Sequence, residues 1–370
     1  MWSAVTNAPP RLRGREREQA MTTAAPTAVR MRWRVETWDP GYGASTDEQL
    51  APRQSKVEPM LDVEVGQGSW RPLDPRPRPR VWSSVLFVDG VRRLDAIGWG
   101  DADLPSDGTV SDGSALDGAA GTASMGLFAS YAAGAVRCRA DGAELLAVEV
   151  HRGLFSGWAK VDDVFTSAGR YRGEYESLSV GGPPPAQQLS QAVQRRMRDA
   201  EVSVSRSARS RLTDSRDDDL LVVDGPLHDR THLPRTLGYA KTHDTQYLPA
   251  ELNRVVGMLS PGQRTPVFGL ADRLPRYAWY VRLPGGSSAP WAGVVRVECS
   301  AQLPLAEAII TADGSQRMLC RYASSEYKDA RAPQNLYPIA GLERELRRRL
   351  GDQGLLYRAI RRAAVSTTTR

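Results

Sequence analysis

Cysteine is scarce in this chain, and long apolar runs are missing from it altogether. Its 370 residues include three scattered cysteines, Cys138, Cys299 and Cys320. None of them has a second cysteine or a histidine at the spacing of zinc ligands, so the sequence argues against both a disulfide framework and a structural zinc site. No stretch approaches the roughly 18 consecutive apolar residues that span a membrane. We therefore expect a soluble protein of the reducing cytoplasm, without a membrane partner.

Lysine is also scarce, and arginine supplies most of the positive charge. The chain has 49 basic and 43 acidic residues, which gives a net charge of +6 at pH 7. Basic residues cluster in two ranges, 195–216 and 344–362. A solvated helix face explains either cluster equally well, but two clusters on a basic chain favour a polyanionic partner. Arginine suits such a partner because its planar guanidinium can donate two hydrogen bonds to one phosphate.

Composition divides the chain into three segments. Residues 1–30 are rich in arginine, alanine, proline and threonine and lack the apolar core of a signal peptide, so we expect a disordered tail. Residues 31–80 form an N-terminal extension that ends in a proline- and arginine-rich connector. We expect residues 81–370 to form one α/β domain, interrupted at 98–126 by an acidic loop rich in glycine, serine and aspartate.

Two apolar runs in this domain end in the same dipeptide, Asp-Gly. The first carries Asp89 at its end and the second carries Asp224. They predict buried strands over 81–89 and 219–224, each with an aspartate at its C-terminal tip. A carboxylate in that position is costly to desolvate and usually finds a hydrogen bond, a cation or a metal ion. Asp-Gly is also a common turn after a strand, so neither run alone decides between these explanations.

The pattern between the two runs predicts more strands and then a long helix. Strands are expected at 91–97, as a hairpin partner of the first, and at 127–139 and 144–154. Apolar residues then recur at spacings of three or four and predict an amphipathic helix of about six turns: Leu189, Val193, Met197, Ala200, Val204, Ala208 and Leu212. Glu201 borders this stripe, where its carboxylate can reach the sheet edge or pair with Arg198.

Towards the C-terminus the pattern alternates between helices and strands. The range 316–322 is predicted as a strand, and 339–350 and 354–364 are predicted as helices. No internal repeat divides the domain.

This order of elements predicts a ribonuclease H-like mixed sheet with flanking helices. Three antiparallel strands, a crossover helix and a strand parallel to the first would bring the first and last of these strands side by side. Asp89 and Asp224 would then face each other, and Glu201 would add a third carboxylate from the helix. Three carboxylates suit one or two hard divalent ions, which activate water and stabilise the leaving oxygen in phosphodiester hydrolysis.

Short motifs in the same order resemble those of the NurA nucleases. They extend over roughly residues 80–360 and comprise Phe87-Val88-Asp89-Gly90, Arg198-x-x-Glu201, the runs Val222 to Leu227 and Val294 to Glu298, Gly238-Tyr239-Ala240-Lys241, and Tyr337-Pro338. The resemblance implies a nuclease that degrades DNA from 5′ ends and cuts single strands, with Mn²⁺ or Mg²⁺ as its cofactor. It also implies a ring-shaped homodimer that docks on a hexameric HerA-type DNA-translocating ATPase.

The resemblance also implies roles for individual residues. Asp89, Glu201 and Asp224 match the metal-binding carboxylates, and Tyr337 matches an active-site tyrosine. The family pattern places a metal-binding histidine eight residues after that tyrosine. This chain has Glu345 there, and a glutamate can still bind Mn²⁺ or Mg²⁺ as a harder ligand than imidazole.

Further residues are expected to meet the substrate. Lys241 can contact a scissile phosphate, although an exposed strand lysine explains it equally well. We expect Arg92, Arg195, Arg198 and Arg347 to bind DNA.

Two other functions compete with that of a nuclease. The actin and sugar-kinase fold also uses two Asp-Gly turns, but the extra glycine and hydroxyl residues that wrap ATP phosphates are missing after Gly90 and Gly225, and there is no Walker A motif. A catalytically inactive DNA-channel or adaptor subunit of the ATPase is the stronger rival, because Glu345 replaces the expected histidine. The leading prediction is a metal-dependent deoxyribonuclease that acts in DNA end resection or in defence against foreign DNA.

Overall fold

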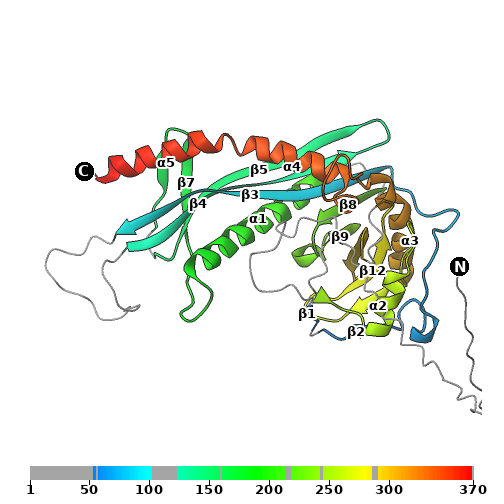
Figure 1. The fold of residues 1–370 in the computed structure, drawn as a ribbon. Helices are drawn as coiled ribbons and strands as arrows, with labels where there is room; N and C mark the ends of the chain where they lie inside the picture. Colours follow the sequence, from blue (N-terminus) through cyan, green and yellow to red (C-terminus); the bar gives the residue numbers. More distant parts are fainter. Residues whose placement is uncertain are drawn as a thin grey trace, which may run out of the picture. The chain divides into compact units, whose positions relative to one another are not determined.

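An eleven-stranded mixed sheet is the framework of the computed structural model (Figure 1), which describes residues 53–55, 57–101, 123–158, 161–212, 218–241, 245–285 and 291–368. These residues lie within the unit Glu36–Arg370. The strand order across the sheet is β2 (Pro59–Met60), β11 (Phe268–Leu270), β12 (Arg276–Arg282), β13 (Val294–Ser300), β9 (Thr236–Ala240), β8 (Asp219–Asp224), β3 (Ser84–Asp101), β4 (Ala123–Cys138), β5 (Ala143–Ser156), β7 (Gly169–Tyr175) and β6 (Val164–Thr166). A separate pair joins β1 (Arg53–Gln54) to β10 (Thr245–Gln246).

Helices flank this sheet. They are α1 (Pro185–Ser210), α2 (Ala250–Gly257), α3 (Leu305–Tyr322), α4 (Tyr337–Arg349) and α5 (Gln353–Thr368), with short 3₁₀ turns η1 (Gln67–Ser69) and η2 (His228–Arg230). No helix in the described ranges has the length and apolarity needed to cross a membrane.

The predicted strand order around the two aspartates is present. Strands β3, β4 and β5 pair antiparallel in sequence, and β8 adds parallel to β3 on its free side after α1. Two strands that the sequence did not predict, β6 and β7, come between β5 and α1 and extend the sheet beyond β5. Strand β9 continues the parallel pairing beyond β8, and β13 returns to antiparallel pairing. The predicted amphipathic helix is α1, whose 26 residues bury the expected apolar stripe from Leu189 to Ala208, while Leu212 lies beyond the end of the helix and is half-buried.

Helices cover both faces of the sheet near β3. Leu86 and Val88 of β3 pack with Ala200 and Val204 of α1. Val91 points the other way and packs against α4. Figure 1 shows the same arrangement, with α1 on one side of β3 and β4 and with α4 and α5 on the other. Because successive residues of a strand point to opposite faces, a residue's position along β3 decides which helix its side chain meets.

The first Asp-Gly dipeptide does not end a strand, which corrects the sequence prediction. Strand β3 runs unbroken from Ser84 to Asp101, and 91–97 belongs to it rather than to a hairpin partner. Gly90 pairs with Ala133 of β4 within this strand, and a glycine is needed there because α1 passes close by: a Cβ would lie 2.6 Å from Glu201 Oε1 and 2.9 Å from Met197 Cγ. The predicted acidic loop 98–126 is shorter at both ends, and its middle, 102–122, lies outside the described residues.

The predicted strand at 316–322 is wrong, because these residues form the last turns of α3. Buried residues continue at helical spacing through this range, from Ala308 and Ala312 to Ser315 and Leu319. Short apolar runs do not distinguish a buried strand from a buried helix, and here the longer helical period decides.

The described part of the predicted N-terminal extension packs onto the sheet through buried charges and an aromatic side chain. Arg264 donates to Glu64 and to Asp313, at 2.7 Å and 2.6 Å, and all three side chains are less than a tenth exposed. Trp70 joins the apolar cluster that α2 forms with β11 and β12. Residues 1–52, including the predicted tail, lie outside the described ranges.

The turn after Asp224 is held by close packing against β9. Gly225 has a φ of +95°, which favours glycine. The next residues lie directly over Gly238, where a Cβ would be 2.5 Å from the Leu227 nitrogen. The Leu227 N–H donates to the buried Glu298 carboxylate at 3.1 Å. Gly238 therefore allows the turn that follows Asp224 to stay in its place.

We expect Gly238→Ala to lower the free energy of unfolding by about 1–3 kcal/mol or more, because the clash is with backbone rather than with a flexible side chain. Gly257→Ala is the matched control, since nothing lies within 4 Å of a Cβ there. That variant should be neutral or slightly stabilising. Thermal and urea unfolding check both. Equal stability of the two variants would contradict the packing described.

Candidate metal centre

Asp89 and Asp224 are neighbours because β3 and β8 pair in parallel. Phe87 pairs with Val222 and Val88 with Val223, so an aspartate comes next on each strand. Phe87 and Val222 both belong to the apolar cluster beneath α3 and the start of α4. Since side chains alternate along a strand, Asp89 and Asp224 point to this same face. The pairing thus places two carboxylates side by side, as the sequence predicts.

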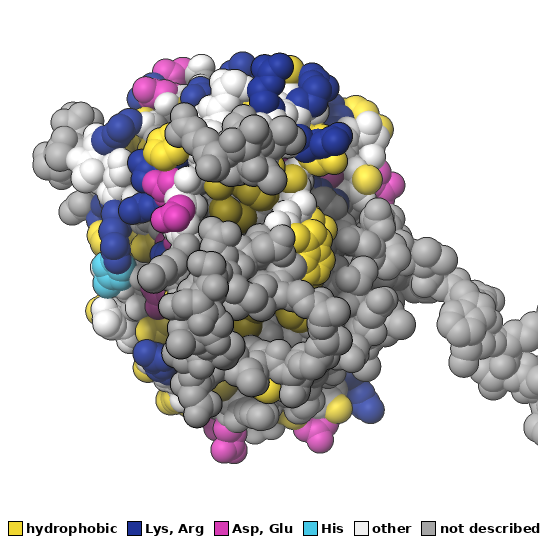
Figure 2. Space-filling view, turned by 90° about the vertical axis from the view of Figure 1, so that its left-hand side faces the viewer, with side chains coloured by type: hydrophobic (Ala, Val, Ile, Leu, Met, Phe, Trp, Pro, Cys, Tyr) yellow, Lys and Arg dark blue, Asp and Glu magenta, His cyan; other side chains and the backbone are white. Residues whose placement is uncertain are grey.

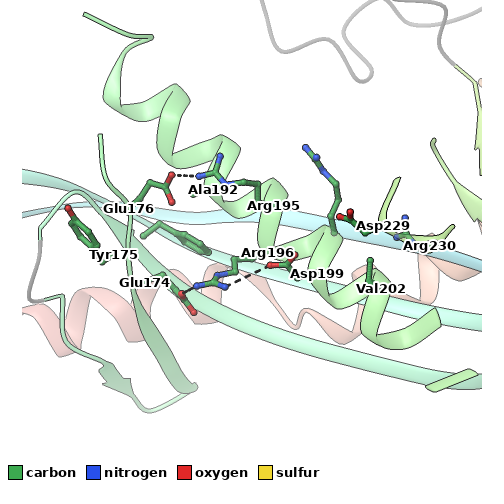
Figure 3. A pocket seen from close by; sticks show the side chains of 12 residues that line it. Glu174, Tyr175, Glu176, Ala192, Arg195, Arg196, Asp199, Val202, Asp229 and Arg230 are labelled. Carbon is green, nitrogen blue, oxygen red and sulfur yellow. Dashed lines mark hydrogen bonds and ion pairs between the residues drawn. The ribbon is translucent and has the colours of Figure 1, made fainter. Parts of the chain in front are cut away.

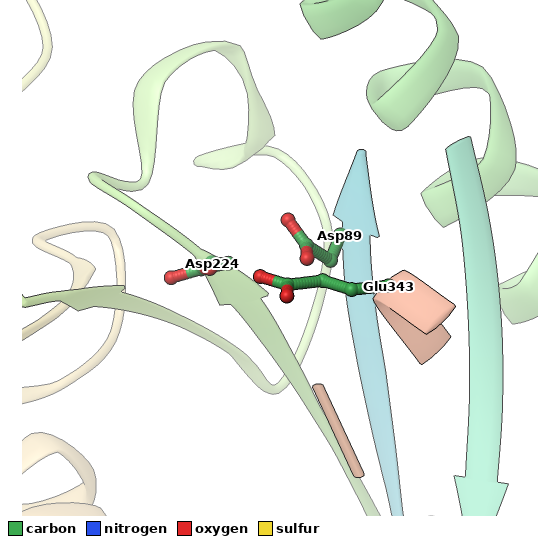
Figure 4. Close-up of side chains that lie close together, drawn as sticks. All are labelled: Asp89, Asp224 and Glu343. Carbon is green, nitrogen blue, oxygen red and sulfur yellow. The ribbon is translucent and has the colours of Figure 1, made fainter. Parts of the chain in front are cut away.

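The third carboxylate of the group comes from α4. Oxygen atoms of Asp89, Asp224 and Glu343 lie within 4.8 Å of one another, and Figure 4 shows Glu343 reaching from α4 toward the two aspartates. Asp89 is 7% exposed and Glu343 5%, whereas the Asp224 side chain keeps 16%. Among the described residues this is the only such group of three metal-ligating side chains. We call it the carboxylate cluster.

Packing of α4 onto the sheet explains the position of Glu343. Leu342 and Leu346 bury their side chains against β3 and β4. Gly134 of β4 allows this close approach, because a Cβ there would lie 2.9 Å from the Leu342 side chain. Glu343 follows Leu342 on the buried side of the helix and faces the paired ends of β3 and β8.

Two cations hold the carboxylates of the cluster. Lys241 Nζ lies 2.5 Å from Asp224 Oδ2, and its side chain is 9% exposed. Arg331 donates to both oxygens of Glu343, at 2.8 Å and 2.5 Å. Such forked guanidinium–carboxylate pairs fix geometry as well as charge. Within the described residues Asp89 has no ion pair of its own.

Asp89 is accordingly the least compensated acid of the cluster. Burial raises the pKa of Asp89 well above its usual range, and the nearby Asp224 and Glu343 raise it further, against the opposing effect of Lys241. One oxygen accepts the N–H of Gly90 at 2.8 Å. The other, Oδ2, is buried without a hydrogen-bond partner in the described structure. An orphaned carboxylate oxygen beside two further carboxylates is suited to a hard divalent cation.

The charge of Lys241 is stabilised by the same cluster. Burial alone would lower the pKa of this ammonium group, but Asp224, Asp89 and Glu343 outweigh burial and raise its pKa. Lys241 therefore stays protonated beside Asp224.

Glu201, predicted as the third metal ligand, lies on the other face of β3. It is a buried residue of α1, and its carboxylate accepts from Arg230 at 2.8 Å rather than pairing with Arg198. Burial raises the pKa of Glu201 to about 7, with Arg230 opposing the shift. The backbone of β3 at Gly90 separates it from the side chain of Asp89. Glu201 thus adjoins the carboxylate cluster without belonging to it.

Glu345, predicted as a metal ligand in place of histidine, points away from the cluster. It follows Glu343 by two residues, which is a rotation of about 200° on a helix. Its carboxylate accepts from Arg348 and Arg349 at 2.8 Å and 2.7 Å, and these hydrogen bonds lower its pKa to about 2. The structure thus brings Glu343, and not Glu345, to the two aspartates.

Tyr337 begins α4 and is 39% exposed. Its hydroxyl lies 2.7 Å from Ser325 Oγ, and the ammonium of Lys328 lies 5.2 Å from its ring centroid. None of these contacts reaches the carboxylate cluster, so the predicted active-site role of Tyr337 stays a prediction.

The four arginines predicted to bind DNA do not form one surface. Arg92 donates to Ser190 of α1, and Arg195 and Arg198 lie on α1 itself. Arg347 lies on α4, on the opposite face of the sheet, 3.7 Å from Glu343. All four are exposed. Only Arg347 is on the side of the carboxylate cluster.

A hollow of about 450 Å³ lies between α1 and β7 (Figure 3), on the α1 face. Its lining includes four arginines and four acids: Arg195, Arg196, Arg198, Arg230, Glu174, Glu176, Asp199 and Asp229. Ion pairs join Arg195 to Glu176 and Arg196 to Glu174 across the gap. Because these charges balance, the hollow has no excess positive charge that would favour a phosphate.

Sequence reasoning missed Glu343 and Arg331. A signal for Glu343 was present: it borders the apolar stripe of Ile339, Leu342 and Leu346, just as Glu201 borders the stripe of α1. Arg331 gave no such signal, since it lies in the irregular segment before α4 and pairs with a residue on a different element.

Known proteins match this chain weakly in structure and not in overall sequence. A scan of protein-family models finds no match, and a search of curated proteins finds none either. The crystal structure of the NurA nuclease from Sulfolobus solfataricus is similar to this chain with a TM-score of 0.39 and 11% sequence identity, over 75% of this chain and 81% of that one. A score of this size does not establish a shared fold.

The pKa of Glu201 predicts a specific dependence of stability on pH. The folded carboxyl keeps its proton up to about pH 7, while the unfolded one loses it near pH 4.5. Between about pH 4.5 and 7 the folded state therefore binds more protons than the unfolded state. The free energy of unfolding then falls as the pH rises, by at most about 1.4 kcal/mol per pH unit.

Glu201→Gln should make the slope shallower by the Glu201 contribution, because glutamine does not titrate, while Asp89, whose pKa is also raised, keeps its own contribution. Urea unfolding between about pH 5 and 8 measures it. The exposed Glu326→Gln is the control and should keep the wild-type slope. Identical slopes in Glu201→Gln and the wild type would show that this carboxyl is not the titrating group.

Proposed function

We propose that this protein is a divalent-metal-dependent nuclease that hydrolyses phosphodiester bonds in DNA. The observation that carries the proposal is the carboxylate cluster: Asp89, Asp224 and Glu343, from three different elements, have oxygens within 4.8 Å of one another. Burying three carboxylates together is costly unless cations compensate them. A cluster of this kind is expected where a cation is part of the function.

The residues present fit a hard divalent ion such as Mn²⁺ or Mg²⁺. All three candidate ligands are carboxylates, which these ions prefer, and Asp89 Oδ2 has no other partner in the described structure. When bound there, the ion would supply an activated water and polarise a phosphoryl oxygen.

The chain's own groups would orient the substrate around that ion. Asp224 is the most exposed acid of the cluster, so a phosphodiester would approach from its side. Lys241, in contact with Asp224, would then face the phosphate and balance its negative charge. Arg331 would keep the carboxylate of Glu343 in its present orientation.

The arginines on the same side of the sheet support a nucleic-acid partner. Helices α4 and α5 carry exposed arginines at positions 344, 347, 348, 358, 361 and 362. Figure 2 shows Lys and Arg side chains gathered along the upper part of one face, the level at which α5 lies in Figure 1. Clustered arginines attract the phosphates of DNA without reading its sequence.

Finer features of the proposal rest on the motif resemblance to the NurA nucleases. They are a ribonuclease H-like sheet, 5′–3′ exonuclease and single-strand endonuclease activity, a homodimer, and a hexameric HerA-type ATPase as partner. The biological setting proposed is DNA end resection or defence against foreign DNA in the cytoplasm. The nuclease is preferred to the inactive adaptor because the adaptor rested on the loss of a ligand at Glu345, and three other carboxylates lie close enough together to hold an ion without it.

Cleavage of single-stranded DNA with Mn²⁺ tests the proposal. We expect Asp89→Asn, Asp224→Asn and Glu343→Gln to lose activity by more than about 100-fold, because each removes an anionic ligand. Glu345→Gln is the matched control two residues along α4. It should stay within about threefold of the wild type, because Glu345 is partly exposed and its ion pairs are with Arg348 and Arg349 rather than with the cluster.

Two results would contradict the proposal in different ways. If the wild type cleaves nothing, even with a HerA-type ATPase present, the inactive adaptor is the better account. If Glu345→Gln is inactive while Glu343→Gln is active, the ligand set is wrong.

A further inference from the structure

The carboxylate cluster already contains a buried positive charge, the ammonium group of Lys241. Lys241 Nζ lies 2.5 Å from Asp224 Oδ2 and 3.0 Å from Asn335 Oδ1. Its side chain is 9% exposed, so the ammonium group is largely removed from water. A lysine buried against a carboxylate in this way is a fixed cation of the centre.

A chain of polar contacts keeps Lys241 in this position. Asn335, which accepts from Lys241, donates to Asp329 Oδ2 at 2.6 Å. Asp329 Oδ1 accepts the backbone N–H of Arg331 at 2.8 Å, and Arg331 in turn holds Glu343. The contacts therefore lead from Asp224 around to Glu343 through the segment before α4. Moving Lys241 away would break a network that also orients a second carboxylate of the cluster.

The charges of the cluster match a single divalent ion. Asp89, Asp224, Glu343 and the adjoining Asp329 carry four negative charges, and Lys241 and Arg331 carry two positive ones, so these six groups together leave two net negative charges. Arg347 also lies 3.7 Å from Glu343, but it is more than half exposed and its charge is largely screened by water. One divalent cation neutralises them. A second would leave two excess positive charges in a largely buried site, where uncompensated charge is expensive.

The ligand atoms available also match one ion. Two-metal centres hold their ions about 3.5–4 Å apart, bridged by a carboxylate that gives one oxygen to each. Asp224 gives one oxygen to Lys241, and Asp89 gives one to the Gly90 N–H. Each aspartate thus keeps one oxygen for an ion, whereas Glu343, both of whose oxygens accept from Arg331, would have to share an oxygen with the ion.

We propose that the centre binds one divalent cation, and that the Lys241 ammonium group takes the place of the second ion of a two-metal centre. This inference rests on the metal centre of the proposed function and defines its composition. It assigns to Lys241 the task of excluding a second ion while supplying a permanent positive charge next to the phosphate.

Manganese binding to the chelator-treated full-length protein tests the inference without DNA or turnover. Free Mn²⁺ is measured by its electron paramagnetic resonance signal, and calorimetry gives the stoichiometry independently. We expect one ion per chain in the wild type and two in Lys241→Met, which removes the ammonium group and frees Asp224 Oδ2. Lys241→Arg should restore one ion, because it returns a cation to the site.

Lys328→Met is the matched control, since it removes an exposed lysine that contacts Tyr337 rather than the cluster. It should bind one ion. Two ions in the wild type, or a single ion in a folded Lys241→Met, would overturn the inference while leaving the metal centre intact. No ion in the wild type would instead contradict the proposed function itself. If Lys241→Met does not fold, the wild-type spectrum still decides, because two Mn²⁺ ions about 4 Å apart couple magnetically and one does not.

Discussion

The compensation of three buried carboxylates is the constraint on which this structure depends. Asp89, Asp224 and Glu343 converge from β3, β8 and α4, and their mutual repulsion disfavours the charged form of Asp89, whose pKa it raises. Lys241 and Arg331 oppose it directly, and both are held by the segment that leads into α4. The same contacts that stabilise the fold at this point therefore prepare a place for one more cation.

The sheet also separates two groups of acids that lie close together in space. Asp89 points toward α4, while Gly90 leaves room on the other face for Glu201 of α1. Glu201 pairs there with Arg230 and has a raised pKa because it is buried. One glycine in the middle of β3 thus allows a charged pair to pack directly behind the proposed metal centre.

Sequence reasoning predicted the pair of aspartates but not the whole cluster. Hydrophobic runs and strand order were enough for Asp89 and Asp224, because register follows from local pattern once two strands pair. Helix periodicity shows which residues share a helix face, but it does not show which face of the sheet that helix covers. Glu201 was therefore named as the third ligand, and Glu343 was not considered. The continuity of β3 was missed because Asp-Gly is also a turn signal, whereas Gly90 is required here by the close approach of α1.

The position of a bound ion tests the central claim most directly. Crystals grown with Mn²⁺ and measured at the manganese absorption edge would locate it by anomalous scattering. The account predicts one anomalous peak per chain, within about 2.0–2.4 Å of oxygens from Asp89, Asp224 and Glu343. An empty cluster, or a peak at Glu345 instead, would contradict it.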